Sequence, residues 1–492
     1  MLDQSQTPVL SALQVSSQRV HAAFYAPGHK GGQGASSRLK ELLGGRALAA
    51  DLPELPELDN LFAPEGVIRA AQELAAAAFG SEQTYFLANG STCGLEAAIL
   101  ATCGPGEKII VPRNVHRSVI GGLVLSGAMP IFVAPEYSPE LGLGLGIKAE
   151  TIAAALAQHP DTRAVLLVSP TYHGICSDTG AIAALAHDHN IPLLIDEAHG
   201  PHFAFHPDLP APSLARGADL VVQSTHKVLG ALSQAAMLHT RGNRIDQSRL
   251  QAALQLTQST SPSALLLASL DAARHQMATE GKERLAEAIV LAQRLRTELA
   301  IPGLRVIDRA AAVAHPSVSD ADVTRLTVDV GGLGLTGLEA DEILHGELGV
   351  TVELPELRHL TLIVSLGNTA ADVQHCVAGF GALAEHAAAS RSLPQQAMLP
   401  QVTPSAMVYT LPIVSPREAF FAAAETVTAS AAPGRISADT ISAYPPGIPT
   451  VVAGEQITAA AIAYLTTVKQ QGGYVTGSSA PEPETFRVLE HC

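Results

Sequence analysis

The amino-acid sequence predicts an α/β protein with a mostly parallel sheet, and three observations lead to this prediction. Short, almost continuous apolar runs alternate with helical stretches between residues 66 and 270, which is typical of strands buried on both faces. Polar side chains follow most of these runs directly, as in open α/β sheets that bind ligands at the carboxyl ends of their strands. Hydrophobic residues make up 47% of the 492 residues and charged residues only 15%, which favours a large packed core over disorder.

Residues 1–65 are expected to form a short helix and an extended arm. Within residues 1–20, one face of an amphipathic helix gathers Val9, Leu10, Leu13 and Val20. A glycine-rich loop over 24–32 follows and contains His29 and Lys30, although glycines of this kind also mark a simple turn.

The arm itself covers Asp51–Asn60 and carries four acids between prolines and leucines. The prolines exclude a regular helix here. Two interpretations remain open for the four acids: a solvated loop, or a set of carboxylates for a basic substrate. They are Asp51, Glu54, Glu57 and Asp59.

The first strand–turn–helix unit of the sheet contains a candidate phosphate site. An Ala-rich helix over Gly66–Phe79 precedes a strand over Thr84–Leu87, and Asn89-Gly90-Ser91-Thr92 then opens a second Ala-rich helix. Backbone N–H groups at a helix N-terminus are unpaired and favour an anion. Alternatively, Ser91 only caps the helix.

The remaining strands of the sheet are apolar runs, with helices expected near residues 148–158 and 180–188. Each run except the last ends close to a polar group, and His116 is one of these. This histidine could stack on a planar cofactor or simply cap the following helix. The strands are expected at Lys108–Val111, Pro130–Val133, Ala164–Val168, Leu193–Ile195, Leu220–Val222 and Ala235–His239.

Two of these strand ends carry a complementary acid and lysine. Asp196 follows one run directly, and Lys227 comes shortly after another in Ser224-Thr225-His226-Lys227. A pyridoxal phosphate enzyme needs a lysine to form a Schiff base and an acid to pair with the pyridine nitrogen. Taken alone, Lys227 could equally be an exposed surface lysine, because lysine is rarely buried.

The second half of the chain indicates further domains. A long helix is expected over Leu265–Leu299, followed by a smaller α/β region at 304–375 and a Ser/Gln/Pro-rich linker from Ser390 to Pro404. The expected division is an N-terminal helix and arm (1–65), a large cofactor-binding domain (66–270), a small α/β domain (271–390) and a C-terminal α+β domain (391–492).

Charge and cysteine usage exclude several classes of function. The net charge of −16 disfavours nucleic acid or an anionic membrane as the main partner. The five cysteines include no C-x-x-C pair, which predicts a reduced, cytoplasmic protein with no disulfide framework and no metal site. The N-terminus does not have the pattern of a signal peptide. The apolar run at 118–134 is interrupted by glycines and a proline, so a buried helix, turn and strand are expected instead of a membrane span.

Six motifs, in order along the chain, resemble the Orn/Lys/Arg decarboxylase family of fold type I (aspartate aminotransferase-like) pyridoxal phosphate enzymes. The resemblance is strongest to the short form without an N-terminal receiver-like domain, which includes bacterial arginine decarboxylases. The motifs are Pro27-Gly28-His29-Lys30-Gly31-Gly32, Asn89-Gly90-Ser91-Thr92, Arg113-Asn114-Val115-His116-Arg117-Ser118, Asp196-Glu197-Ala198-His199, Ser224-Thr225-His226-Lys227 and Tyr444-Pro445-Pro446-Gly447.

The resemblance implies a role for each matching residue. Lys227 would form the Schiff base, Asp196 would pair with the ring nitrogen, and His226 would contact the substrate carboxylate or reprotonate Cα. The other implied cofactor contacts are His116 on the ring face, Ala198 beneath the ring, Ser91, Thr92 and Ser224 at the phosphate, and Thr171 and the catalytic candidate His199 near the ring. The implied substrate-binding acids are Asp51, Glu54, Glu57, Asp59 and, as a weaker match, Glu455.

The expected reaction is decarboxylation of a basic amino acid by a homodimer or larger homo-oligomer with shared active sites. Arginine, giving agmatine and CO₂ for polyamine biosynthesis, is favoured; lysine is second and ornithine third. A pyridoxal phosphate aminotransferase or lyase is disfavoured, because the stretch Leu360–Asn368 offers no arginine to bind a substrate carboxylate. A non-catalytic homologue remains open.

Overall fold

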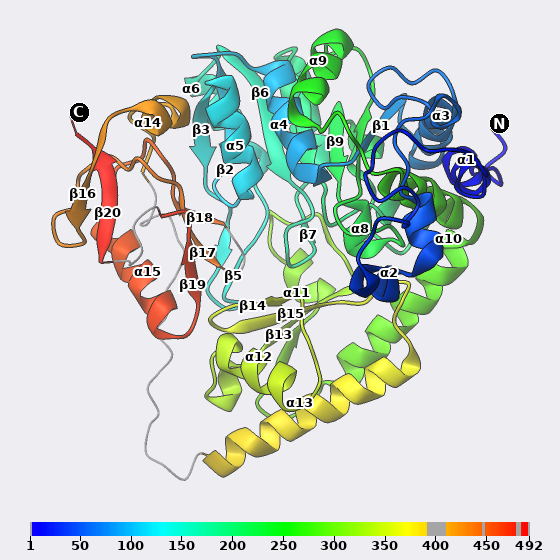
Figure 1. The fold of residues 1–492 in the computed structure, drawn as a ribbon. Coiled ribbons are helices and arrows are strands. Elements are labelled where there is room, and N and C mark those ends of the chain that lie inside the picture. The colour runs from blue at the N-terminus through cyan, green and yellow to red at the C-terminus, as the bar shows by residue number, and fades with distance from the viewer. Residues whose placement is uncertain (1, 391–409, 445–447, 479–483, 491–492) are drawn as a thin grey trace. The chain divides into compact units, whose positions relative to one another are not determined.

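The computed structural model describes residues 2–390, 410–444, 448–478 and 484–490. The chain divides into two compact units (Figure 1). The first comprises Met1–Ala101 and Leu194–Leu285, and the second comprises Thr102–Leu193 and Ala286–Cys492. The linker expected at Ser390–Pro404 lies outside the described residues apart from Ser390, as do Pro445, Pro446 and Gly447 of the last motif.

The strands of the first unit follow the order β1-β10-β9-β8. β8 and β9 are parallel, whereas β10 runs antiparallel to both β9 and β1. The predicted strands are therefore present, and β10 is the one among these four that runs in the opposite direction, because β1, antiparallel to β10, points the same way as β8 and β9. The bounds are β1 (Gln83–Leu87), β8 (Leu193–Asp196), β9 (Leu220–Gln223) and β10 (Ala236–Thr240).

The three helices predicted for the first unit after residue 66 are present as α3, α4 and α10, whereas α8 and α9 were not predicted and the N-terminal helix is shorter than expected. α1 covers only Pro8–Ser17. Val9 and Leu13 are buried as predicted, whereas Val20 lies beyond the helix and is fully exposed. The arm is irregular except for one 3₁₀ turn, η1 (Pro56–Leu58). The other helices are α2 (Ser37–Ala50), α3 (Val67–Phe79), α4 (Gly90–Thr102), η2 (Phe203–Phe205), η3 (Ser213–Arg216), α8 (Thr225–Val228), α9 (Gln247–Thr257) and α10 (Ala264–Glu298).

The second unit begins with three parallel strands, in which β2 lies between β3 and β6. β2 and β6 are largely buried, as the near-continuous apolar runs predicted, whereas β3 is mostly half-buried. The elements are β2 (Lys108–Pro112), α5 (Arg117–Ser126), β3 (Met129–Val133), α6 (Ala149–Gln158), β6 (Thr162–Val168) and α7 (Thr179–Asp188), with the short strands β4 (Tyr137–Ser138), β5 (Leu143–Gly144) and β7 (Ile175–Cys176).

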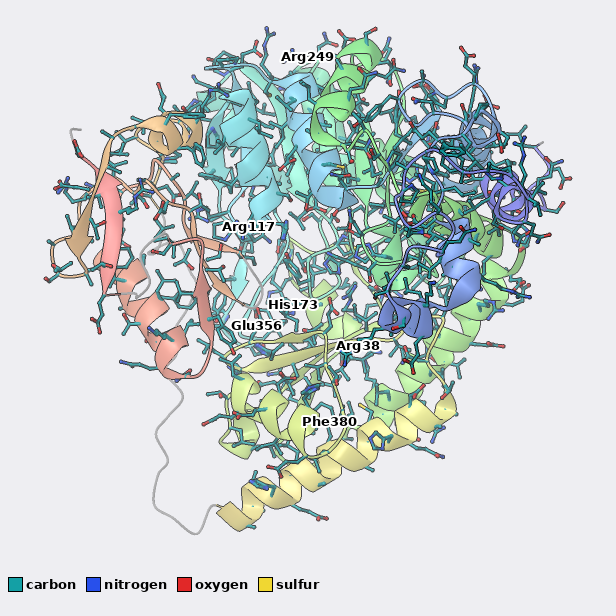
Figure 2. The ribbon with its side chains drawn as sticks, in the orientation of Figure 1. Arg38, Arg117, His173, Arg249, Glu356 and Phe380 are labelled. Carbon is teal, nitrogen blue, oxygen red and sulfur yellow. The ribbon has the colours of Figure 1, made fainter. Side chains whose placement is uncertain are left out.

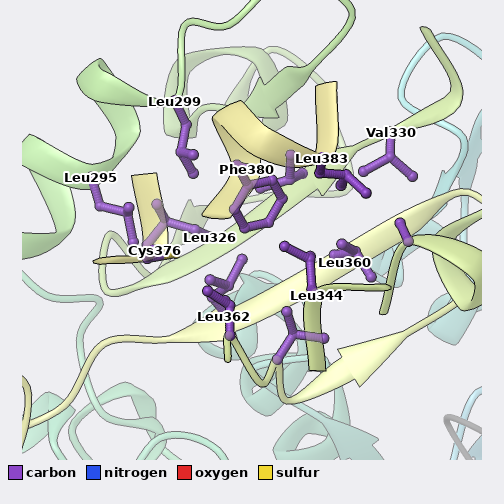
Figure 3. Close-up of a cluster of buried hydrophobic side chains, with 14 of the residues drawn as sticks. Leu295, Leu299, Leu326, Val330, Leu344, Leu360, Leu362, Cys376, Phe380 and Leu383 are labelled. Carbon is purple, nitrogen blue, oxygen red and sulfur yellow. The ribbon is translucent and has the colours of Figure 1, made fainter. Parts of the chain in front are cut away.

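The predicted smaller α/β region is present as a four-stranded antiparallel sheet in the order β11-β13-β15-β14. Helix α13 supplies Phe380, which is fully buried among leucines and valines from this sheet and from α10 and α12 (Figure 3). The elements are β11 (Arg305–Ile307), α11 (Arg309–Val313), β12 (Asp320–Ala321), β13 (Arg325–Asp329), η4 (Gly331–Leu333), α12 (Gly337–Gly346), β14 (Leu354–Pro355), β15 (His359–Ile363) and α13 (Ala370–Ser390).

The C-terminal segment has small cores of its own. Phe486 and Val488 of β20 pack with Leu465 and Val468 of α15, which indicates a separately packed α+β region. Among the described helices of the whole chain, none is long and apolar enough to cross a membrane. The elements are α14 (Pro416–Phe421), β16 (Ala424–Thr428), β17 (Ile441–Tyr444), β18 (Pro449–Val451), α15 (Ala459–Gln470), β19 (Tyr474–Thr476) and β20 (Thr485–Leu489).

Candidate active site

Two hydroxyls meet at the start of helix α4 in the first unit. Gly90 has a φ of 76°, which a residue with a side chain rarely adopts, and it turns the chain from β1 into the helix. Ser224, at the end of β9, donates a hydrogen bond from its Oγ to Ser91 Oγ over 2.8 Å. A Cβ at Gly94 would lie 2.6 Å from Leu87 Cδ1 and 2.8 Å from Val222 Cγ1, so only glycine lets the first turn approach the strands this closely. The result is a helix N-terminus with hydroxyls beside it, which suits a phosphate.

Lys227 lies on the single turn of α8, directly after β9. Its Nζ is 3.0 Å from His199 Nε2. Because a protonated lysine can only donate, this bond places the lone pair of the imidazole on His199 Nε2. His199 is itself buried. The contact brings together a lysine and a histidine that are 28 residues apart in the sequence.

Asp196 is the last residue of β8 and its side chain is buried. Burial raises the pKa of Asp196, while the positive charge of Lys227 and a hydrogen bond from the Ala198 N–H (3.1 Å) lower it. A buried acid with a raised pKa has a high affinity for protons, so it can share a proton with a basic partner such as a ring nitrogen. Ala198 is also buried, two residues beyond Asp196.

His226 has its orientation fixed by the backbone. Its Nδ1 lies 3.0 Å from the carbonyl oxygen of Ala235, and its own N–H donates to the same oxygen over 3.2 Å. Because a carbonyl can only accept, Nδ1 carries a proton. The neutral ring then has its lone pair on Nε2.

The remaining cofactor candidates belong to the second unit, apart from Thr92, which is exposed in the first turn of α4. His116 is the N-cap of α5 and accepts the Ser118 N–H over 3.2 Å, so the capping role considered from the sequence is present. Thr171 follows β6 and accepts the Ile175 N–H over 3.2 Å. The roles of these three residues toward the cofactor stay predictions.

The acids of the arm are held within the arm and its neighbours. Glu54 accepts the Leu61 N–H over 2.7 Å and a hydrogen bond from Asn60 over 2.8 Å. Glu57 accepts from Ser16 and Arg19 over 3.2 and 3.3 Å.

Asp59 and Asp51 are also engaged. Asp59 accepts the N–H groups of Gly66, Ile68 and Arg69 and so caps α3. Burial raises its pKa, but hydrogen bonds from backbone N–H groups outweigh burial and lower it. Asp51 pairs with His29 Nε2 over 3.0 Å, and its side chain remains 40% exposed. Asp51 (40% exposed) and Glu57 (37%) therefore keep similarly accessible carboxylates, but Glu57 already contacts the cationic Arg19.

Glu455, the weakest substrate-binding candidate, is also committed to a structural contact. Both of its carboxylate oxygens accept from Arg113, over 3.1 and 2.8 Å, and one accepts the Val452 N–H. The two side chains are 2% exposed. These contacts favour a structural role for Glu455. This pair was not predicted from the sequence, because its members are 342 residues apart.

A second buried cluster in this unit was also missed from the sequence. His173 Nε2 lies 3.4 Å from Glu356, and its Nδ1 lies 3.2 and 3.3 Å from the hydroxyls of Thr361 and Thr327 (Figure 2). Burial lowers the pKa of His173 to about 4, so the ring is neutral at physiological pH. Burial raises the pKa of Glu356.

The residues gathered in the first unit fit pyridoxal phosphate. Next to Ser224, the Thr225 Oγ1 is buried and has no hydrogen-bond partner among the described residues. Buried hydroxyls are normally satisfied, so this one indicates a missing polar partner such as a phosphate. The lysine, the buried acid and the helix N-terminus supply the other contacts that the cofactor needs.

Comparison with known proteins agrees with this chemistry. The profile of the Orn/Lys/Arg decarboxylase major domain matches residues 7–391, and that of the C-terminal domain of the same family matches residues 385–477. An arginine decarboxylase of Halalkalibacterium halodurans is 39% identical over 99% of this chain and 98% of its own length. An arginine decarboxylase of Bacillus subtilis is 37% identical with the same coverage.

Lysine decarboxylases are more distant relatives. Lysine decarboxylase LdcA of Pseudomonas aeruginosa is 29% identical over 55% of this chain and 40% of its own length. Two solved structures share the fold. The constitutive lysine decarboxylase of E. coli has a TM-score of 0.82 at 22% identity, covering 99% of this chain and 82% of that one. The lysine decarboxylase LdcF of Francisella novicida has a TM-score of 0.81 at 22% identity, covering 98% of this chain and 81% of that one.

The predicted fold type I architecture is confirmed by these structures, and the family profiles cover nearly the whole chain. The cofactor is pyridoxal phosphate, and the enzyme is a decarboxylase whose substrate is a basic amino acid. This chain belongs to the Orn/Lys/Arg decarboxylase family.

Proposed function

We propose that this enzyme decarboxylates L-arginine to agmatine and CO₂, as a step of polyamine biosynthesis. The observation that carries the reaction is the strand-end group in which Lys227 contacts His199 and acts electrostatically on the buried Asp196. The choice of arginine is supported by two arginine decarboxylases that are 39% and 37% identical over nearly the full chain, against 29% over about half of it for a lysine decarboxylase.

Bound pyridoxal phosphate supplies an electron sink for the bond between Cα and the carboxylate. The residues of the chain then divide the remaining work. Ser91, Ser224 and the N-terminus of α4 bind the phosphate, and Asp196 holds a proton at the ring nitrogen. Lys227 would hold the cofactor through its Nζ, and His199 Nε2 would accept a hydrogen bond from the Lys227 ammonium whenever the lysine is not bound to the cofactor.

After CO₂ leaves, Cα must gain one proton so that the product amine can depart. His226 is the proposed donor. Its Nδ1 is occupied by the Ala235 carbonyl, so the proton would be delivered from Nε2. Histidine is the side chain that most often serves as a general acid in enzymes.

Recognition of the guanidinium needs at least one carboxylate. Asp51 is the first candidate, because its partner His29 leaves the carboxylate 40% exposed. Glu54, Glu57 and Asp59 are engaged by neighbouring groups, and we propose that they shape the arm. As part of the same proposal, the protein forms a homodimer or larger homo-oligomer in which the arm completes a partner's site, and its domains are 1–65, 66–270, 271–390 and 391–492.

The test is turnover of arginine, lysine and ornithine by purified protein with added pyridoxal phosphate, following both CO₂ and the amine. The control pair is Lys227→Ala and Lys282→Ala, because Lys282 is an exposed lysine on α10. We expect agmatine from arginine, abolished by the first substitution and unaffected by the second. Cadaverine or putrescine as the main product would overturn the choice of substrate. No amine from any of the three, with the cofactor bound, would overturn the reaction.

A further inference from the structure

Directly after Asp196 in the sequence, Glu197 is a second buried acid that the mechanism above does not use. Its side chain is 1% exposed. Its N–H donates to the Val222 carbonyl over 2.9 Å, so the pairing of β8 with β9 continues one residue beyond Asp196. Successive residues of a strand point to opposite faces. Asp196 and Glu197 therefore lie back to back across the sheet.

The same alternation applies on β9. Ser224 contacts Ser91 on the cofactor face, whereas the preceding residue, Gln223, reaches Glu197. Phe79 packs against the His239 ring at a centroid distance of 4.8 Å. The face opposite the cofactor is thus covered by α3 and contains its own polar cluster.

That cluster is a continuous chain of hydrogen bonds across the strands. Glu197 accepts from the N–H and Oγ of Ser213, over 2.9 and 2.6 Å, and from Gln223 Nε2 over 2.7 Å. Gln223 Oε1 lies 3.1 Å from His239 Nε2, and His239 Nδ1 lies 2.8 Å from Thr84 Oγ1. Because Gln223 Oε1 can only accept, His239 carries its proton on Nε2 and accepts from Thr84 at Nδ1.

In this series of hydrogen bonds from Thr84 to Glu197, each donor therefore donates in the direction of Glu197. Three donors converge on the carboxylate, an arrangement that stabilises its charged form. Burial acts in the opposite direction and, together with a smaller contribution from the charge of Asp196, raises the pKa of Glu197 to about 7. The other titratable group of the cluster, His239, has a pKa lowered to about 3 by burial, so it stays neutral. Glu197 is then the group of this face that changes charge near neutral pH.

We propose that Glu197 is a positioning residue for the cofactor: it anchors the end of β8 from behind and places a negative charge next to Asp196 that helps retain a proton on the ring nitrogen. This inference rests on the proposed role of Asp196. The physical reason is that a nearby negative charge raises the proton affinity of a buried acid and of any base paired with it. Loss of the charge at Glu197 should make that proton easier to lose.

The experiment follows the absorbance of bound pyridoxal phosphate as the pH is varied, and the dissociation constant of the cofactor, in the purified holoenzyme. Glu197→Gln keeps the size of the side chain but removes its charge. Glu197→Asp keeps the charge. Asp271→Asn is the matched control, since Asp271 is a fully buried acid of the same unit that pairs with Arg274.

We expect Glu197→Gln to move the midpoint of the spectral titration to lower pH by more than about half a unit and to weaken cofactor binding several-fold. Glu197→Asp should restore most of the wild-type midpoint, and Asp271→Asn should leave it unchanged. If Glu197→Gln does not fold, Ser213→Ala should shift the midpoint in the same direction by less, because it removes one donor that stabilises the charge.

An unchanged midpoint in Glu197→Gln, or in Ser213→Ala if that variant replaces it, would overturn the inference. A shift of equal size in Asp271→Asn would overturn it as well, because the effect would then come from general loosening of the fold. Asp196→Asn tests the proposed role of Asp196 separately from that of Glu197. If its cofactor absorbance titrates as in the wild type, the proposed role of Asp196 fails whatever Glu197 does.

Discussion

Buried acids occur in two kinds of surroundings in this protein. Asp271 and Glu455 each contact an arginine, Arg274 and Arg113 respectively, and each also accepts backbone N–H groups. Asp196 and Glu197, at the end of β8, contact no arginine within the part of the chain that the structure describes. Instead, Asp196 has the nearby charge of Lys227, and Glu197 has a hydroxyl, an amide and a backbone N–H.

The partner of a buried acid therefore distinguishes acids that stabilise the fold from acids that take part in the reaction. An arginine does not lose its proton in a protein, so it favours the charged form of an acid paired with it, although burial raises the pKa of both Asp271 and Glu455. Lysine can lose a proton, and hydroxyls and amides carry no net charge, so acids with these partners keep a proton affinity that the surroundings can tune. We therefore expect substitutions at the end of β8 to change chemistry and pH dependence, and substitutions of the arginine pairs to change stability.

The largest effect is expected for Asp196→Asn. The neutral amide cannot hold a positive charge on the ring nitrogen, so kcat/KM for arginine should fall by about 1,000-fold or more, the scale seen when a group that stabilises a transition state is removed. Steady-state kinetics with saturating cofactor measure this. Asp271→Asn is the matched control and should keep kcat/KM within about threefold of the wild type. A decrease of less than about tenfold in Asp196→Asn would remove the distinction between the two sets of acids.

The second effect concerns stability. Arg113→Met leaves Glu455 buried without its partner, which typically costs about 3–5 kcal/mol of unfolding free energy. Urea denaturation measures the change. The double variant Arg113→Met/Glu455→Leu should recover much of the loss, because an apolar pair of similar volume avoids the uncompensated charge. If Glu455→Gln instead raised KM for arginine without loss of stability, Glu455 would belong to the substrate site, as the sequence resemblance first implied.

The contrast between these sites also explains how much the sequence could predict. Lys227, Asp196 and Ser224 were found because each follows an apolar strand, and strand ends converge whatever the details of packing. The Glu197 chain was missed because it depends on the register of four strands, in which Thr84 lies opposite His239 and Gln223 lies one strand away. An acid directly after a buried strand indicates a candidate functional residue at position 197, but nothing in the sequence identified the partners of Glu197.

The contacts of the acidic arm were also not predicted. The sequence left open a solvated loop or a set of substrate carboxylates, and the structure adds backbone N–H groups that donate to Glu54 and Asp59, while the role of the acids toward substrate stays a prediction. For Asp59 the signal was available, because Gly66 and a helix follow it within ten residues, and helix N-termini need an acceptor. Similarly, the antiparallel β10 was not predicted, because an apolar run does not specify strand direction.

A third prediction uses the pH dependence of stability. The pKa of Glu197 is about 7 in the folded protein, against 4.5 for an ordinary glutamate. The folded state therefore binds the extra proton, and the contribution of Glu197 to stability is fully present below pH 4.5 and is lost as the pH rises to about 7. The loss is on the order of 3 kcal/mol. Urea denaturation of apo wild type and Glu197→Gln across this range should show the variant gaining relative stability as the pH rises. A constant difference between the two would mean that Glu197 does not titrate there.

The smallest effect is expected within the arm, where Asp59 and Asp51 differ in their contacts. Asp59→Ala removes the acceptor for the first N–H groups of α3 and should cost about 1 kcal/mol, the usual value for a lost helix cap. Because its carboxylate is already engaged, KM for arginine should change by less than about twofold. Asp51→Asn should do the reverse, raising KM about tenfold with little loss of stability, since it removes a charged hydrogen bond to the guanidinium. Kinetics and urea denaturation on both variants decide the question. If Asp59→Ala raised KM as much as Asp51→Asn, the arm would have to bind substrate as a unit, and the division between supporting and reactive acids would not extend beyond the core.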